Sequence, residues 1–428
     1  MKSKLSARFW CALTLFSLFG QVAWVVENMY LNVFIYKMFR ATAADISLMV
    51  TASAITATLT TVLIGALSDR IGKRKLFICG GYVLWGISLI AFAFLRVDWI
   101  PKLFPMTVSA ASVGVSLTII LDCVMTFFGS SANDAAFNAW LTDSTDETNR
   151  GAAEGINAMM PLVAILVVFG GFMAFSLDSA ENWSIIFTII GGITLLVGAL
   201  GFFLIQDAPV QPSQTRYWQN VIYGFRPSTV KANKELYISL LIFVVFNISI
   251  QIFMPYLIIY YEESLGMKDY VMIMAPAIIL ASVATALWGR IYDRKGFSFS
   301  AIISLVSLLC GYAVLFLFRS TVPVFLGSLL MMCGYLCGMA VFGARIRDLT
   351  PIGKAGMLQG VRIFSQVLVP GVIGPYIGKL VLSNAQTITN DDGTTSFIPN
   401  ANIFLAALIP AAIVLAVCLI LGKKKVQK

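Results

Sequence analysis

The sequence predicts an all-α integral membrane protein with twelve transmembrane helices in two pseudo-symmetric six-helix bundles. Three observations predict this class: the composition, the length of the apolar runs and a pair of repeated motifs. Of the 428 residues, 59% are hydrophobic and 12% are charged, and the mean hydropathy is +0.86. Soluble domains carry about 25% charged residues. The chain therefore has no room for a sizeable soluble domain.

The apolar residues form continuous runs of about 20 residues or more, the length at which a helix crosses a hydrocarbon core of about 30 Å. The runs do not alternate between apolar and polar residues, which excludes a transmembrane β-barrel. The first run is too long for a signal-peptide core and lacks a small-residue cleavage site, so we expect it to be retained. Twelve runs are present, centred near residues 23, 56, 87, 122, 165, 194, 248, 280, 308, 335, 368 and 412.

One long polar segment divides the chain. It runs from Gln206 to Glu235 and contains three prolines. We therefore expect an N-terminal six-helix bundle in 1–205, a cytoplasmic central loop in 206–234 and a C-terminal six-helix bundle in 235–428. A shorter polar insert, 384–400, precedes the last run and is expected to be an outer loop.

The net charge of +9 follows membrane topology. Lysines and arginines precede the first span, follow the second and last spans, and fill the central loop, while the other loops hold few. With both termini in the cytoplasm, this distribution obeys the positive-inside rule. We expect a multi-pass protein of the cytoplasmic (cell) membrane, with the lipid bilayer as its macromolecular surroundings and no nucleic-acid partner.

Two short basic motifs are copies of each other. Gly65–Gly72 reads GALSDRIG and Gly289–Gly296 reads GRIYDRKG, so both follow G-x-[LI]-x-D-R-x-G between two apolar runs. A second repeat aligns Phe137–Asp143 with Phe342–Asp348. Two matches in the same order argue against chance similarity between membrane loops. Parallel repeats of six spans indicate a transporter built from two similar halves.

The first motif resembles the loop between the second and third spans of the major facilitator superfamily, G-x-L-x-D-r-x-G-[RK]-[RK]. Gly65, Asp69, Arg70, Gly72 and the bases that follow fit this pattern. The resemblance implies the major facilitator fold and a latch that joins the cytoplasmic ends of neighbouring helices. Physically, the glycines permit a tight turn and close helix approach. The alternative is that the bases only fix topology, which does not explain an Asp and two glycines repeated in register.

A cytoplasmic gate is therefore expected from the two motifs and from the charged ends of the fourth and tenth spans. Asp143 and Arg150 belong to the charged loop after the fourth span. Asp348, at the end of the tenth span, aligns with Asp143 in the second repeat. The expected gate residues are Gly65, Asp69, Arg70, Gly72, Asp143, Arg150, Gly289, Asp293, Arg294, Gly296 and Asp348.

Within the superfamily, Asn133–Trp140 resembles the fourth span of the glycoside–pentoside–hexuronide cation symporters, the melibiose permease group. Asp134 and Phe137 match that group, and Arg362 stands where its eleventh span carries a functional lysine. The group places acidic residues for sodium on the second span, whereas Ile46–Leu67 contains none. The coupling ion, a proton or another monovalent cation, therefore stays open.

Ionisable residues inside spans are candidates for function because each costs about 2.5–3.5 kcal/mol to insert. Asp134 lies nine residues before Asp143, about 13 Å deep in an α-helix. We expect Asp134 and Arg362 to face each other across a cavity, and the alternative is a permanent ion pair. Asp122 is expected to be interfacial. The substrate or coupling-ion set is Asp134, Arg362, Gln21, Trp24, Glu27, Asn28, Asn133, Asn157, Asn247, Gln251, Gln359 and Gln366.

The expected function is secondary transport by alternating access, in the form of cation- or proton-coupled uptake of a sugar or glycoside. The alternative is a proton-coupled exporter of drugs or other amphipathic molecules. Gly371–Gly378 superficially resembles an antiporter motif, but it lies on the eleventh span rather than the fifth. Ser130, Asp134 and Asn138 recur at i, i+4 and i+8 and predict a polar stripe on the fourth span, and Gln21, Asn28 and Asn32 are expected on one face of the first span. These polar stripes favour a hydroxylated substrate. We expect a monomer whose partner is a small molecule.

An enzyme or ATP-driven pump is not expected, because the chain has no G-x-x-x-x-G-K-[ST] loop and no nucleophile–base pair. Histidine is absent and the seven cysteines are scattered, so no metal site is expected. No cofactor is expected beyond the coupling proton or monovalent cation.

Overall fold

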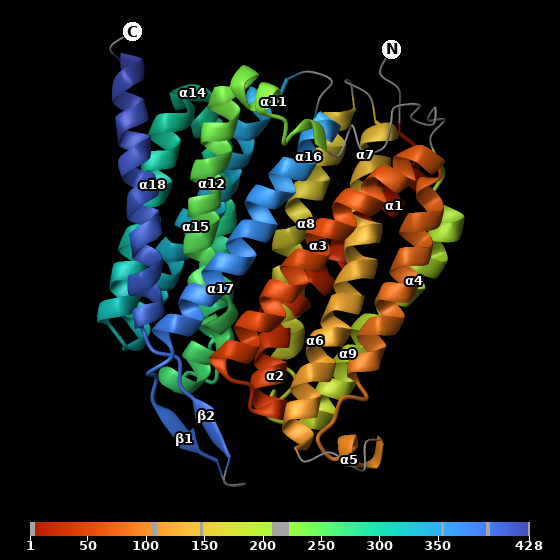
Figure 1. Cartoon of the computed structure of the whole chain (residues 1–428), viewed down its shortest axis with the longest axis vertical. Coiled ribbons are helices and arrows are strands. Elements are labelled where there is room, and N and C mark those ends of the chain that lie inside the picture. Colours follow the sequence, from red (N-terminus) through yellow and green to blue (C-terminus); the bar gives the residue numbers. More distant parts are fainter. Residues whose placement is uncertain are drawn as a thin grey trace. The chain divides into compact units, whose positions relative to one another are not determined.

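A computed structural model describes residues 5–103, 109–145, 149–207, 222–351, 355–390 and 394–426. These residues are mostly helical, and Figure 1 shows long helices joined by short connections. In the described part of the chain, eleven helical segments are long and apolar enough to cross a membrane. The chain is a multi-pass membrane protein.

The N-terminal spans follow the apolar runs of the sequence. The first span consists of α1, a π-helical segment η1 and α2, and the fourth consists of α6, a π-helical segment η2 and α7. Their bounds are α1 Ala7–Val25, η1 Val26–Tyr30, α2 Leu31–Phe39, α3 Ala43–Ile71, α4 Arg74–Phe92, α5 Ile100–Leu103, α6 Ala110–Gly129, η2 Ser130–Phe137, α7 Asn138–Asp143, α8 Arg150–Phe172 and α9 Ala180–Leu204.

The C-terminal part repeats this plan and adds a small hairpin between its last two spans. Strands β1 and β2 pair antiparallel. The bounds are α11 Pro227–Ala232, α12 Lys234–Phe253, η3 Met254–Tyr256, α13 Leu257–Ile259, η4 Tyr260–Ser264, α14 Val271–Leu317, α15 Thr321–Leu349, α16 Ala355–Ile363, η5 Phe364–Leu368, α17 Val369–Val381, β1 Thr387–Thr389, β2 Thr395–Phe397 and α18 Asn402–Val426.

Helix α14 accounts for the difference between eleven segments and twelve predicted spans. It has 47 residues, and Gly296 inside it has non-helical dihedrals, φ 76° and ψ 179°. A positive φ is accessible to glycine at little cost. The chain therefore turns at Gly296 between two spans, and the twelve-helix prediction agrees with the structure.

The chain forms two compact units, one of Met1–Ala41 with Ala52–Ile222 and one of Thr42–Thr51 with Tyr223–Lys428. We call them unit 1 and unit 2. In unit 2, α18 runs from the side of the hairpin to the C-terminal end of the chain (Figure 1).

Glycines allow close helix packing inside each unit. In unit 1, a methyl group on Gly86 of α4 would lie 2.5 Å from the backbone nitrogen of Leu195 in α9. A methyl group on Gly191 would lie 2.7 Å from the carbonyl oxygen of Gly86. Small residues at such crossings let backbones approach, because apolar lipid provides no hydrophobic force between helices.

Candidate functional site

The polar residues of the first span do not share one environment. Gln21 and Trp24 are half-buried, Asn28 is exposed and Asn32 is buried. The amide groups of Asn28 and Asn32 donate to the carbonyl oxygens four residues earlier, at 2.8 and 2.9 Å. The single polar face expected for this span is therefore interrupted, because η1 changes the helical phase within it.

Trp24 packs against another indole. The centroid of the Trp24 ring lies 5.0 Å from that of the Trp85 ring. A methyl group on Gly129 would lie 3.1 Å from the Trp24 ring. Packing between helices therefore covers part of the Trp24 side chain. The part that stays exposed can contact a bound ring.

Asp134 lies in the π-helical segment η2. The depth of about 13 Å and the polar stripe of the fourth span were both predicted for an α-helix. Ser130 Oγ donates to Asp134 Oδ2 at 3.1 Å. The amide of Asn138 donates to the carbonyl oxygens of Asp134 (3.1 Å) and Asn133 (3.3 Å). Ser130 is buried, Asp134 is half-buried and Asn138 is exposed. The wider turn therefore rotates Asn138 out of the predicted stripe, since π-helical bonds join residues five apart.

Asn133 is a satisfied core amide. Its Nδ2 donates to the Tyr82 hydroxyl at 2.7 Å, and that hydroxyl donates to the carbonyl oxygen of Phe16 at 2.6 Å. Asn157 is also engaged, because Ser17 Oγ donates to its Oδ1 at 2.5 Å. These contacts join helices within unit 1 and favour a structural role for both asparagines.

The unit 2 candidates lie on α12, α16 and η5. Asn247 is buried and donates to the carbonyl oxygen of Phe243 at 2.8 Å, whereas Gln251, Arg362 and Gln366 are half-buried. The side chain of Gln359 lies outside the described residues. Because Asp134 belongs to unit 1 and Arg362 to unit 2, their pairing stays a prediction.

Five of the twelve candidates lie in π-helical segments. Glu27 and Asn28 are in η1, Asn133 and Asp134 are in η2, and Gln366 is in η5. Single π turns inside α-helices occur frequently at functional sites. This concentration supports the choice of the first, fourth and eleventh spans.

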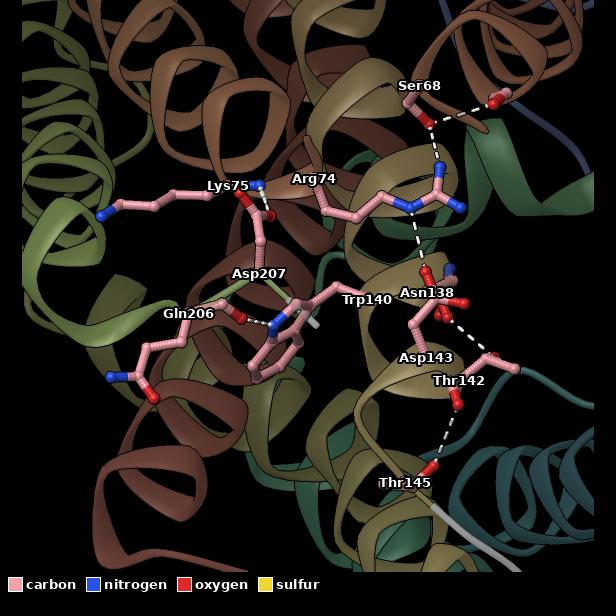
Figure 2. A network of polar contacts seen from close by, with 11 residues as sticks. Ser68, Arg74, Lys75, Asn138, Trp140, Thr142, Asp143, Thr145, Gln206 and Asp207 are labelled. Atoms are coloured by element: carbon pink, nitrogen blue, oxygen red, sulfur yellow. Dashed lines mark hydrogen bonds and ion pairs between the residues drawn. The ribbon is translucent and has the colours of Figure 1, made fainter. Parts of the chain in front are cut away.

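The first repeated motif joins a network at one end of unit 1 (Figure 2). Arg74 Nε donates to Asp143 Oδ2 at 3.1 Å and its Nη1 donates to Ser68 Oγ at 2.6 Å. The Arg74 side chain is 6% exposed and that of Asp143 is 22% exposed. Ser68 in turn donates to the carbonyl oxygen of Gly65 at 3.0 Å. Arg74 therefore joins the ends of α3 and α7.

The segment after α9 attaches to the same end of unit 1. Asp207 Oδ1 accepts from the backbone nitrogen of Lys75 at 2.7 Å, in the first turn of α4, where a negative charge is favourable. The indole of Trp140 donates to the carbonyl oxygen of Gln206 at 2.9 Å. The network thus joins three spans of unit 1 and the segment that follows α9.

The second motif makes a simpler contact in unit 2. The Tyr292 hydroxyl donates to Asp348 Oδ2 at 2.5 Å, and both residues retain exposure. Nearby, Arg345 Nη2 lies 3.1 Å from Glu235 Oε2, and the Arg345 guanidinium lies 5.4 Å from the centroid of the Phe297 ring.

The structure gives positions for most of the gate residues that the two motifs predict. Arg70, Asp293 and Arg294 are exposed, and the side chains of Asp69 and Arg150 lie outside the described residues. Gly72 and Gly296 have positive φ, 71° and 76°, as the tight turns require. Gly65 is half-buried and Gly289 is exposed.

Sequence reasoning did not select Ser68, Arg74 and Tyr292 for the gate. The motif holds several bases in succession, and their order does not tell which one points inward. The register of the two repeats would have shown Ser68 and Tyr292 at the same motif position.

Asp122, which was expected at the membrane interface, is 1% exposed and is therefore enclosed by neighbouring helices of the protein. Asp122, Thr126, Ser130 and Asp134 recur every four residues, a spacing that would have indicated one buried polar ladder.

Comparisons with known proteins give the family and the fold. The family model described as Major Facilitator Superfamily matches residues 9–375. No curated protein matches the chain. The crystal structure of the nucleoside transporter NupG matches with TM-score 0.69 and 14% identity, over 96% of this chain and 98% of that one. A bacterial homologue of the human lysosomal transporter Spinster, inward-facing and occupied, matches with TM-score 0.70 and 15% identity, over 98% of each chain.

Proposed function

Because the chain belongs to the major facilitator superfamily, we propose that it imports a small hydroxylated molecule, a sugar or glycoside, together with a proton or another monovalent cation. The family makes it a secondary transporter rather than an enzyme. The substrate class, the coupling and the direction are the proposal. We place it in the cell membrane, as a monomer with both termini in the cytoplasm.

The observation that carries the proposal is the environment of Asp134. It is an ionisable side chain within a span, it accepts from Ser130, and it retains partial exposure next to buried neighbours. A charge in a span is costly unless it meets water, a partner or a substrate. Half-buried Gln21 and exposed Asn28 add polar groups in unit 1 that suit hydroxyl recognition.

The comparisons are compatible with this substrate class. One structural neighbour is named as a nucleoside transporter. A nucleoside is chemically an N-glycoside, so it presents the same ring hydroxyls as a sugar and adds an aromatic base. Trp24 offers the ring face on which such a base or a sugar ring can stack. Nucleosides therefore belong in the panel of candidate substrates.

Uptake into proteoliposomes tests the proposal. Labelled sugars, glycosides and nucleosides are offered with a proton gradient and, separately, with a sodium gradient. We expect one of them to accumulate with one gradient, and Asp134→Asn to lose gradient-driven accumulation. The double variant Asp134→Asn/Asn138→Asp, which moves the carboxylate four residues along the span, is the matched control.

Two results would contradict parts of this proposal. Full accumulation in Asp134→Asn with unchanged pH and cation dependence would remove Asp134 from coupling. Failure to take up any of the panel, together with gradient-driven efflux of lipophilic cations, would favour the drug exporter.

A further inference from the structure

The segment around α11 in unit 2 exposes basic and apolar side chains together. Arg226, Lys231 and Lys234 are exposed there. Ile222 is 50% exposed and Phe225 is 46% exposed. We call these five residues the α11 surface. Neither the proposed substrate site nor the expected gate uses any of them.

Contacts within unit 2 hold this segment in place. The Tyr237 hydroxyl, on α12, donates to the carbonyl oxygen of Gly224. Asn233 Nδ2 donates to the carbonyl oxygen of Thr229 at 2.9 Å, where α11 ends. Thr229 itself is buried, so one side of α11 packs against unit 2. The opposite side is therefore presented to the surroundings in a fixed orientation.

The last base of the α11 surface lies at the end of an apolar stripe on α12. Ile238 and Leu241 are 49% and 67% exposed, while Leu236 and Leu240 are buried. Lys234, Ile238 and Leu241 are spaced i, i+4 and i+7, so they share one face of the helix. Lys234 lies about 6 Å before Ile238 by helical rise. Its ammonium group can therefore reach the headgroup layer while the exposed Ile238 and Leu241 contact acyl chains.

The bases of the α11 surface have charge to spare. Among the described residues, Arg226, Lys231 and Lys234 take part in no ion pair. The neighbouring Glu235 is paired with Arg345 instead. Exposed bases next to a membrane span attract the phosphate groups of anionic lipids. A segment that exposes bases beside isoleucine and phenylalanine suits the boundary between headgroups and acyl chains.

From this juxtaposition, we propose that the α11 surface binds an anionic phospholipid, with the headgroup phosphate on the three bases and the acyl chains along Ile238 and Leu241. Binding is non-covalent. A zwitterionic lipid fits less well because its net charge is zero. A free phosphate ion has nothing to place against the apolar side chains.

The α11 surface is also attached to the eleventh span. The ring centroids of Phe225 and Phe364 lie 5.7 Å apart, with the rings edge to face. Phe364 begins η5, the π-helical segment that carries Gln366. A lipid on the α11 surface would therefore contact a residue that packs against η5. The inference uses none of the substrate candidates, so it and the proposed function can fail separately.

The position of α11 agrees with this partner. In unit 2, α11 lies at the same end as the C-terminal end of α18 (Figure 1). With the termini in the cytoplasm, as we propose, this end meets the cytoplasmic leaflet, where anionic lipids lie. A test in detergent does not depend on that orientation.

Native mass spectrometry of the purified full-length protein tests the proposal. Phosphatidylglycerol and phosphatidylcholine with the same acyl chains are added in equal amounts, and the bound fraction of each lipid is measured. We expect the wild type to bind phosphatidylglycerol more tightly. Arg226→Gln, Lys231→Gln and Lys234→Gln should each lower the affinity for phosphatidylglycerol about fivefold, the usual contribution of one base near an anionic surface.

A matched pair of double variants separates a site from a general effect of charge. Lys231→Gln with Lys234→Gln removes two exposed lysines of the α11 surface, and Lys102→Gln with Lys268→Gln removes two exposed lysines elsewhere. We expect the preference for phosphatidylglycerol to be nearly lost in the first pair and kept in the second. An unchanged preference in the first pair, or equal losses in both, would overturn the proposal.

A free anion is the competing occupant of a basic surface. Replacement of chloride by inorganic phosphate at equal ionic strength should leave the bound phosphatidylglycerol unchanged, because phosphate alone lacks the acyl chains. Displacement of the lipid by inorganic phosphate would assign the surface to a free anion and would overturn the lipid assignment.

Discussion

The two copies of the D-R-x-G turn follow the same sequence pattern, yet each turn is attached to its partner aspartate in a different way. In unit 1, Ser68 and Asp143 are joined by the buried guanidinium of Arg74. In unit 2, the Tyr292 hydroxyl reaches Asp348 directly. Ser68 and Tyr292 occupy the same motif position, as do the two aspartates in the second repeat.

The difference follows from side-chain length. Serine is too short to span the distance that tyrosine covers, so the unit 1 turn uses Arg74 as an intermediate. The residue that aligns with Arg74 in the second copy is Ser298, which has no charge. Both solutions attach the loop between two spans to the end of a helix two spans later. The attachment is repeated, but its chemistry and burial are not.

Removal of Arg74 should have the largest effect. Arg74→Ala leaves Asp143 without its guanidinium and Ser68 without its donor, and breaking a buried pair from one side costs about 3 kcal/mol. We expect a drop of several degrees in the thermal midpoint of the protein in detergent, and reduced transport. Arg70→Ala, which removes an exposed base of the same turn, is the control and should change the midpoint little. Equal losses in the two variants would show that the bases act only through net charge.

The turn glycines should have similar effects in both copies. Gly72 and Gly296 have φ of 71° and 76°, and an alanine held at such a φ costs about 1–3 kcal/mol. At Gly296 no atom lies within 4 Å of an added methyl group, so backbone strain alone would act. Thermal midpoints of Gly72→Ala and Gly296→Ala should fall together. Gly289→Ala, at an exposed position with no such φ, is the control. A neutral Gly296→Ala would contradict the assigned turn.

Much of the fold could be predicted from the sequence because span length and repeated glycines are local signals. The break at Gly296 within α14 was placed correctly by its motif. The position of Asn138 was not, because η2 changes the helical phase and no residue type announces a π turn. The hydrogen bonds of Glu27 were missed for another reason. They come from Ser53 and Thr126 on two other spans, and one sequence does not tell which faces of three helices meet.

Loss of the Tyr292 hydroxyl should have a smaller effect than loss of Arg74. Tyr292→Phe removes one hydrogen bond to an exposed carboxylate, which water can replace, so we expect about 1 kcal/mol or less. A double-mutant cycle with Asp348→Asn measures the coupling, and the same cycle on Arg74 and Asp143 provides the comparison. We expect the unit 1 cycle to give the larger coupling energy. The reverse order would mean that burial does not set the strength of the two attachments.

The smallest effect is expected at the ion pair of Arg345 and Glu235, which lies beside the second turn. The Glu235 side chain is 74% exposed and that of Arg345 is 19% exposed. Exposed pairs contribute about 0.2–1 kcal/mol and are screened by salt. Glu235→Gln should therefore lower the thermal midpoint slightly at low ionic strength and leave it unchanged at high salt. The Arg74 pair is buried, so the effect of Asp143→Asn should persist at high salt. A salt-independent effect at Glu235 would mean that the contact of Arg345 with Phe297 depends on the carboxylate, and that unit 2 has a second structural attachment besides Tyr292.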